Sequence, residues 1–148
     1  MDGDNLLLNE EREAEVQEPF TSLQDVQSRG IKPRMLSQAC AADRPDIVQW
    51  LLDAGVTVEY HDLLSAIGRD YCLALLLTKS PDLLHADHGW TLLHSAALIG
   101  CEKSCQILIK AGCPLDSLTA KFETPLNLAI CNKRQDVVKL LISRARHH

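Results

Sequence analysis

Cysteine and histidine are the residues of this chain whose chemistry suits metal binding or catalysis. Cys101 and Cys105 are four residues apart, on one face of an expected helix, and His85, His88 and His94 precede them. Thiolates and imidazoles are the usual ligands of structural zinc. Such sites normally contain closely spaced ligand pairs, and the sequence has neither a Cys-x-x-Cys nor a His-x-x-x-His pair. We therefore expect no metal ion and no other cofactor.

A cysteine nucleophile is the alternative chemistry for the same residues. It would need a thiolate with a lowered pKa beside an oriented base. The candidates are Cys101, at the start of an expected helix, and His94, one helix earlier, with Asp87 or Glu102 available to orient the imidazole. Because the chain shows no convincing cluster of acid, base and nucleophile, we expect no enzyme activity and no small-molecule substrate.

The cysteines also indicate where the protein functions. Five of the six fall inside or beside expected helices, at positions suited to a small residue. Thiols at such positions are typical of a reduced protein interior, and disulfides are rare in the cytosol and nucleus. We interpret all six as free thiols of a cytoplasmic or nuclear protein: Cys40, Cys72, Cys101, Cys105, Cys113 and Cys131.

The elements that position these residues are short helices separated by tight turns. Between residues 87 and 112 the sequence predicts a turn, a helix, a second turn, a second helix and a stop. Thr91 is a good N-cap, because its hydroxyl can accept a hydrogen bond from the first helical turn. Gly100 and Gly112 can each end a helix in the left-handed conformation.

This pattern recurs along the chain with a regular period. Thr91-Leu92-Leu93-His94-Ser95-Ala96-Ala97 is followed one period later by Thr124-Pro125-Leu126-Asn127-Leu128-Ala129-Ile130. Both segments resemble the ankyrin repeat, whose signature is Thr-Pro-Leu-His-x-Ala and whose period of about 33 residues equals the offset between Thr91 and Thr124. A further copy is found at 36–40 with 47–55, and a degenerate one at 63–68 with 72–77. The resemblance covers roughly residues 31–143.

The resemblance implies an all-α solenoid of about four helix-turn-helix repeats, the second of them degenerate and shortened. We expect an N-terminal capping helix over 21–30, starting with a capping box at Ser22 and Asp25. Residues 1–20 are expected to be an acidic disordered tail, either a solubilising extension or a docking motif around Leu6-Leu7-Leu8. The ankyrin-repeat domain is predicted over 31–148, with repeats at about 31–58, 59–84, 85–115 and 116–148.

Charge and hydropathy argue against two other classes of function. The formal net charge is −5, and residues 1–18, with seven acids and one base, contribute −6 of it. The rest of the chain is therefore close to neutral and has no basic stripe, so we expect no nucleic-acid binding. No apolar run approaches the ~20 residues that span a bilayer, so we expect no membrane insertion.

In the ankyrin family the finger tips and the first helices of the repeats form a concave surface that binds other proteins. The resemblance therefore implies a non-catalytic adaptor or regulatory subunit, with a partner such as a kinase or a transcriptional regulator. We expect Trp90 and Phe122 to be the anchors of this surface; the alternative for both is packing on the neighbouring hairpin. The other expected contacts are a polar rim of Asp87, His88, Lys121 and Glu123, a groove floor of Leu98, Ile99, Leu128 and Asn132, and a secondary region at Tyr60, His61 and Tyr71.

The end of the fourth repeat leaves another organisation open. Leu140, Leu141 and Ile142 are apolar where a terminal repeat usually turns polar. A partner, a second copy of the chain or a further repeat would cover that face. In the last case the chain is the N-terminal fragment of a larger ankyrin scaffold.

Overall fold

The computed structural model describes residues 22–80, 82 and 89–146, and within them the chain forms nine helices and no strand. The expected tail at 1–20 and the rim residues Asp87 and His88 lie outside these residues. The helices are α2 (Leu23–Arg29), α3 (Met35–Ala41), α4 (Pro45–Asp53), α5 (Tyr60–Ser65), α6 (Asp70–Lys79), α7 (Leu92–Ile99), α8 (Glu102–Lys110), α9 (Pro125–Cys131) and α10 (Gln135–Arg146).

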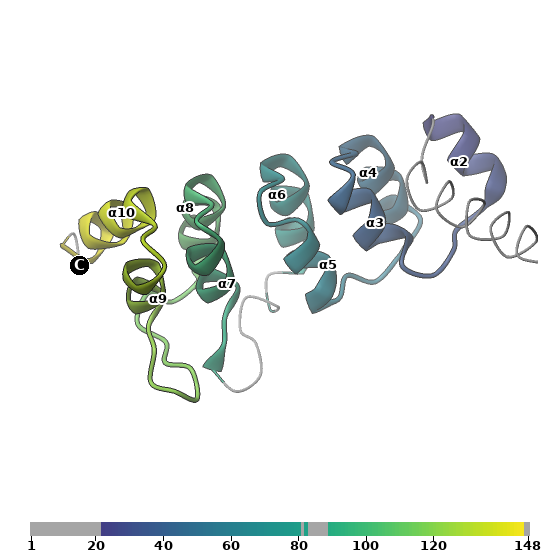
Figure 1. The fold of residues 1–148 in the computed structure, drawn as a ribbon. Coiled ribbons are helices and arrows are strands. Elements are labelled where there is room, and N and C mark those ends of the chain that lie inside the picture. Colours follow the sequence, from purple (N-terminus) through teal and green to yellow (C-terminus); the bar gives the residue numbers. More distant parts are fainter. Residues whose placement is uncertain (1–21, 81, 83–88, 147–148) are drawn as a thin grey trace, which may run out of the picture.

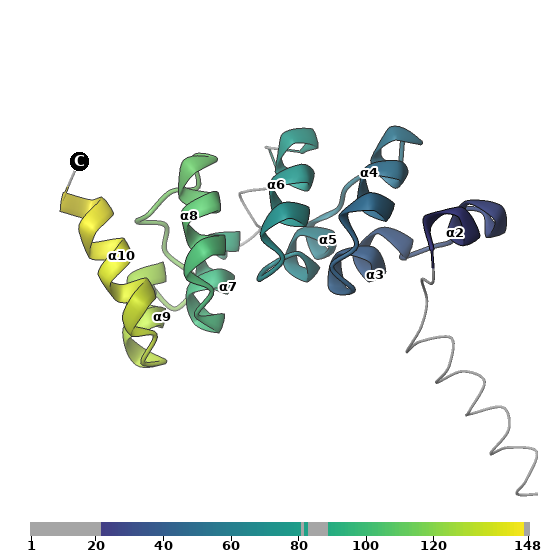
Figure 2. The same cartoon turned by 90° about the horizontal axis from the view of Figure 1, so that it is seen from above.

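The helices stack as pairs along one direction, from α3 with α4 to α9 with α10 (Figure 1). Contacts join α3, α5, α7 and α9 in one layer and α4, α6, α8 and α10 in the other. Seen from above, the array is elongated, with α2 at one end and α10 at the other (Figure 2). The expectation of an all-α repeat solenoid is confirmed.

The start of α7 follows the chemistry predicted for Thr91, and the start of α9 repeats it. The Thr91 hydroxyl accepts a hydrogen bond from the backbone N–H of His94 at 3.3 Å, and His94 Nδ1 accepts from the backbone N–H of Thr91 at 3.1 Å. Thr124 and Asn127 repeat the same reciprocal pair, each bond at 3.1 Å, with Pro125 at the first helical position. Each such cap contributes about 1 kcal/mol to stability.

Gly100 ends α7 in the left-handed conformation, as predicted, with φ 93° and ψ 24°. A second constraint acts on the same residue, because a Cβ at Gly100 would lie 2.7 Å from Cδ of Arg134. That arginine belongs to the following pair, and its Nε donates a hydrogen bond to the carbonyl of Leu98 at 3.0 Å. The glycine therefore leaves room for a side chain that joins the third pair to the fourth.

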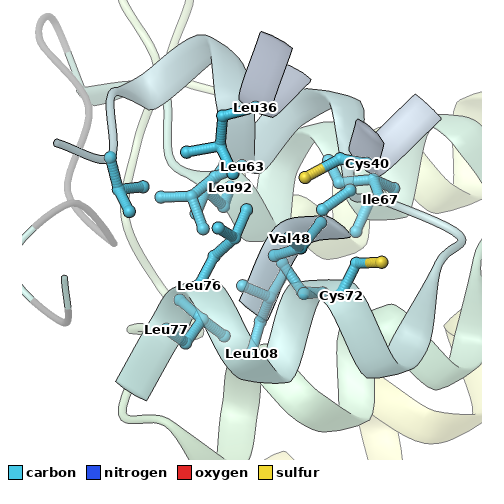
Figure 3. Packing of buried hydrophobic residues seen from close by; sticks show 14 of the residues in the cluster. Leu36, Cys40, Val48, Leu63, Ile67, Cys72, Leu76, Leu77, Leu92 and Leu108 are labelled. Carbon is cyan, nitrogen blue, oxygen red and sulfur yellow. The ribbon is translucent and has the colours of Figure 1, made fainter. Parts of the chain in front are cut away.

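The core continues from pair to pair along the array and includes residues of both layers. Leu36, Leu63 and Leu92, from α3, α5 and α7, appear close together in the view of Figure 3. Ala96 and Ala97 on α7 are completely buried. Their small side chains let α9, which contacts α7, approach closely.

The second pair departs from the others in length and in its connections. Its first helix, α5, has six residues, and its second, α6, ends at Ser80 rather than at a glycine. The backbone N–H of Gly68 donates to Ser104 Oγ at 2.8 Å, which joins this pair to the third. On the other side, Arg69 donates to the carbonyl of Ala41 in the first pair at 3.2 Å.

Helix α2 lies against α4 at the N-terminal end of the array. Ser22 Oγ accepts from the backbone N–H of Asp25 at 3.1 Å, which is the N-cap half of the predicted capping box. Val26 is 2% exposed and points into the core, whereas most of the other side chains of the helix are exposed. This helix covers apolar surface of the first pair and turns a polar face outward.

Candidate partner-binding surface

The finger before α9, residues 117–124, is a turn organised by one buried hydroxyl. Thr119 is 7% exposed, and its Oγ accepts from the backbone N–H groups of Lys121 and Glu123, both at 3.2 Å. The backbone closes the turn, since Thr119 N–H donates to the carbonyl of Glu123 at 3.0 Å and Phe122 N–H donates to the carbonyl of Thr119 at 2.9 Å. The finger tip is thus held by its own hydrogen bonds.

Phe122 at this tip is 80% exposed. It therefore does not pack on the neighbouring hairpin, which was one of the two interpretations of this aromatic. Its φ is 61°, in the left-handed region that bulky residues seldom adopt. Local strain of this kind is commonly found at functional sites, where surrounding structure holds it in place.

Trp90 behaves differently from Phe122. It is half-buried, its Nε1 donates to Ser95 Oγ at 2.7 Å, and its ring stacks on that of His94 with centroids 5.5 Å apart. It also lines a hollow of about 270 Å³ together with Thr119 and Glu123 of the finger. Trp90 is therefore a fixed wall of this hollow.

His94 connects α7 to this finger. Its Nδ1 accepts from the backbone N–H of Thr91, so the proton of the neutral ring is on Nε2, which donates to the carbonyl of Glu123 at 2.9 Å. Burial lowers the pKa of His94, which favours the neutral ring, although the bond to the Glu123 carbonyl acts in the opposite direction. The finger that carries Phe122 is consequently attached to the third pair.

The two hydrogen bonds of the His94 ring decide whether His94 can act as the base for a Cys101 nucleophile. Both ring nitrogens of His94 are already engaged, so the imidazole is not free to act as the base. Burial raises the pKa of Cys40, Cys72 and Cys105 to about 12, 11 and 12. Those three thiols are protonated at neutral pH and are poor nucleophiles.

The expected groove floor is only partly open. Ile99, at the end of α7, is 51% exposed and Leu98 is half-buried. Leu128 is 5% exposed and belongs to the core, because α9 turns it inward. Asn132 is exposed, and its amide donates to the carbonyl of Leu128 at 2.7 Å, so it caps the end of α9.

Two rim residues and the secondary region are also placed. Lys121 is exposed and Glu123 is half-buried, both beside Phe122. Tyr60 and His61 lie on α5, and Tyr71, which is 67% exposed, lies on α6 in the other layer. The structure therefore does not bring these last three residues into one cluster.

Two exposed apolar residues and one buried acid were not predicted as site residues. Leu118 is 50% exposed in the finger, and Ile130 is 54% exposed on α9. Asp62 is 3% exposed on α5. Its position gave a usable signal, since it stands three residues after the N-cap Glu59, as His94 stands after Thr91.

No grouping of three or more metal-ligating side chains occurs in residues 22–80, 82 and 89–146. His85 and His88, considered above as zinc ligands, are outside these residues. Within the same ranges no helix has the length and apolar character required to cross a bilayer.

Stacked helix pairs that present a fixed finger beside a hollow define a repeat module that binds other proteins. The family description "Ankyrin repeats (3 copies)" matches residues 36–148, and the chain therefore belongs to the ankyrin-repeat family. It is also similar to Rabankyrin-5 of Mus musculus, with 38% identity over 58 residues. That match covers 39% of this chain and 5% of Rabankyrin-5, so it concerns a small part of the longer protein. Members of this family are generally non-catalytic.

Proposed function

We propose that the chain is a non-catalytic adaptor or regulatory subunit that binds a partner protein on the concave side of its third and fourth repeats. The observation that carries this proposal is Phe122, an aromatic that is 80% exposed at the tip of an internally bonded finger. Aromatic residues dominate interface energetics because they bury much area with few rotatable bonds. An aromatic on an ordered finger loses little further entropy when it binds.

The surroundings of Phe122 support an interface at this place. The hollow of about 270 Å³ between Trp90 and the finger has room for a partner side chain. Lys121 and Glu123 supply charges of both signs near the tip, and Ile99 is a further exposed apolar residue of the third repeat, at the end of α7. An apolar centre with a polar rim is the usual arrangement of a protein–protein interface.

The kind of partner and the location belong to the same proposal. Small ankyrin proteins that consist almost entirely of repeats resemble this chain in plan, and on that analogy the partner is a kinase or a transcriptional regulator. The buried thiols Cys40, Cys72 and Cys105 support a reducing compartment, the cytoplasm or the nucleus.

A larger ankyrin scaffold is the second candidate, and one observation favours it. Ile130 occupies the position in the fourth repeat that Ala97 occupies in the third, and Ala97 is completely buried, whereas Ile130 is 54% exposed. Ile142 on α10 is 39% exposed as well. The outer face of α9 and α10 therefore has the apolar character of a boundary between repeats, and a further repeat would cover it.

Affinity capture with single variants separates the two candidates. The immobilised full chain is used to bind proteins from native cell extract, and proteins retained in stoichiometric amount are quantified. Phe122→Ala should reduce retention at least tenfold, since loss of an anchor costs about 2 kcal/mol or more. Ile142→Ala, a matched truncation of an exposed apolar residue on the other face, should leave retention unchanged. The reverse result would place the interface at the C-terminal end and refute the proposal.

A further inference from the structure

Asp62 is a buried carboxylate at the boundary between the first and second pairs. Its side chain is 4% exposed, and its Oδ2 accepts from the backbone N–H of Glu59 at 2.8 Å. Its Oδ1 is buried and has no hydrogen-bond donor among the residues that the structure describes. Leaving a buried acceptor unsatisfied destabilises the folded state, and more so when the group is charged. A cation bound at Oδ1 would remove this destabilisation.

The imidazole of His61 lies over this carboxylate without satisfying it. His61 Nε2 is 3.4 Å from Oδ1 of Asp62, and its Nδ1 is 3.3 Å from Oε2 of Glu59. The His61 side chain is 54% exposed. Because it is on the surface and forms no hydrogen bond with Oδ1, an incoming group can displace it without disturbing the core.

A cavity of about 190 Å³ opens beside Asp62. Its lining includes Glu59, His61 and Asp62 together with apolar Pro33 and Val56. This volume corresponds to roughly six water molecules of ~30 Å³ each. Lysine and arginine combine an apolar stem with a charged head, so such a side chain matches a pocket with an apolar wall and an acidic end.

The chain's own cations do not fill this role. Lys32 and Arg34 line the same cavity, yet neither forms an ion pair with Asp62 or Glu59 within the described ranges. Their side chains are exposed, so they keep their hydration. The acidic end therefore remains available to a cation from another molecule.

We propose that this pocket, lined by Glu59, His61 and Asp62, binds one arginine or lysine side chain of the partner protein. The cationic head pairs with Asp62 Oδ1 and Glu59, and the stem lies along Pro33 and Val56. This inference rests on the proposed function, because the basic side chain belongs to the bound protein. It assigns a definite chemistry to the secondary region around His61.

The test is a titration of the full-length, ¹⁵N-labelled chain followed by NMR. The probes are N-acetyl-arginine methylamide and N-acetyl-lysine methylamide, and N-acetyl-glutamine methylamide is the uncharged control. We expect saturable shifts of the backbone amides of Glu59, His61 and Asp62 with a dissociation constant of about 1 mM, typical of a single weak contact. Equal shifts with the glutamine probe, or no saturation with either basic probe, would overturn the proposal.

Two variants identify the charge responsible. Asp62→Asn keeps the shape and an acceptor for the Glu59 N–H, and it should weaken binding of the basic probes at least tenfold. Asp53→Asn, at an exposed acid on α4, is the matched control and should have no effect. If Asp62→Asn does not fold, Glu59→Gln, at an exposed residue, should weaken binding about threefold. Basic probes that bind a folded Asp62→Asn variant as tightly as the natural chain would refute the assignment.

The outcome for the pocket is independent of the outcome for Phe122. Probe binding depends only on residues of the first and second pairs, whereas the capture experiment depends on the finger of the fourth. If Phe122→Ala retains the partner fully and the basic probes still bind as described, the proposed interface fails and the pocket stands. If the basic probes do not bind while Phe122→Ala loses the partner, the pocket proposal fails and the proposed interface stands.

Discussion

Replacing Gly100 by alanine tests how the third pair is joined to the fourth. Gly100 has φ 93°, and an added Cβ would be 2.7 Å from Cδ of Arg134. The arginine side chain is flexible and would move away. It would then lose the hydrogen bond that its Nε donates to the carbonyl of Leu98 at 3.0 Å. The substitution therefore combines backbone strain with the loss of a contact between repeats.

The expected cost follows from these parts. An alanine in the left-handed region costs about 1–2 kcal/mol, and a hydrogen bond from a charged donor at a solvated position contributes about 1.5 kcal/mol. The reduced freedom of the unfolded chain offsets about 0.4–1 kcal/mol. Gly100→Ala should therefore lower the free energy of unfolding by about 2 kcal/mol. Gly112→Ala is the matched control, because Gly112 has φ 101° with no atom within 4 Å of its added Cβ, and it should cost about 1 kcal/mol from strain alone.

Urea denaturation monitored by far-ultraviolet circular dichroism at 25 °C measures both costs, provided the m-value stays constant. The decisive comparison uses an Arg134→Ala background, where no long side chain remains to be displaced. In that background Gly100→Ala should cost about as much as Gly112→Ala. Equal costs of the two glycine substitutions in the natural chain, or a Gly100→Ala cost that does not depend on Arg134, would refute the reasoning.

Three further predictions concern the finger, the buried histidine and the thiols. Phe122→Gly should raise the free energy of unfolding by roughly 0.5–1 kcal/mol, because glycine accepts a left-handed φ, while partner capture falls at least tenfold. Because burial lowers the pKa of His94 in the folded protein, the unfolded chain binds the proton on this residue more readily. The contribution of His94 to the free energy of unfolding is therefore complete above pH ~6.5 and decreases as the pH falls below that value. His94→Asn places at 94 the residue type found at the equivalent position 127. In urea titrations from pH 7.5 to 5, this variant should lose the His94 part of the slope of unfolding free energy against pH, and an unchanged slope would contradict the assignment. A thiol reagent at neutral pH should modify exposed Cys131 first and should reach Cys40, Cys72 and Cys105 only after unfolding. Rapid reaction of a single buried thiol in the folded protein would instead support a cysteine nucleophile.

Features set by neighbouring residues in the chain were predictable from sequence. The N-cap at Thr91, the left-handed glycine at 100 and the helix start at Pro125 depend on backbone groups no more than four residues away. A residue type with one strong local preference is informative at such positions. The repeat period then placed the helix pairs relative to each other, since each pair can bury its apolar face only against the next.

Features set by contacts between repeats were not predictable in the same way. Trp90 was expected as an anchor, with packing on the neighbouring hairpin as the alternative, and neither expectation included its bond to Ser95 and its stacking on His94, which hold it against α7. Leu128 was expected on an open floor, yet it occupies the position in its repeat that Ser95 occupies in the preceding one, and both residues are buried. The helical period alone does not show which side of a helix the adjacent repeat covers. Comparison with the equivalent position of the preceding repeat shows it.

The position three residues after the N-cap shows how one site in the repeat acquires different functions. Asp62, His94 and Asn127 all accept the backbone N–H of their own N-cap, at 2.8, 3.1 and 3.1 Å. The imidazole of His94 has an N–H donor at Nε2, and that donor binds the carbonyl of Glu123 and attaches the finger that carries Phe122. An ionised carboxylate has no donor, so Asp62 cannot attach a following finger in this way, and the second pair is joined to the third through Gly68 and Ser104 instead. The attachment of the fourth-repeat finger to α7 and the unsatisfied oxygen of Asp62 therefore both depend on which side chain stands three residues after the N-cap.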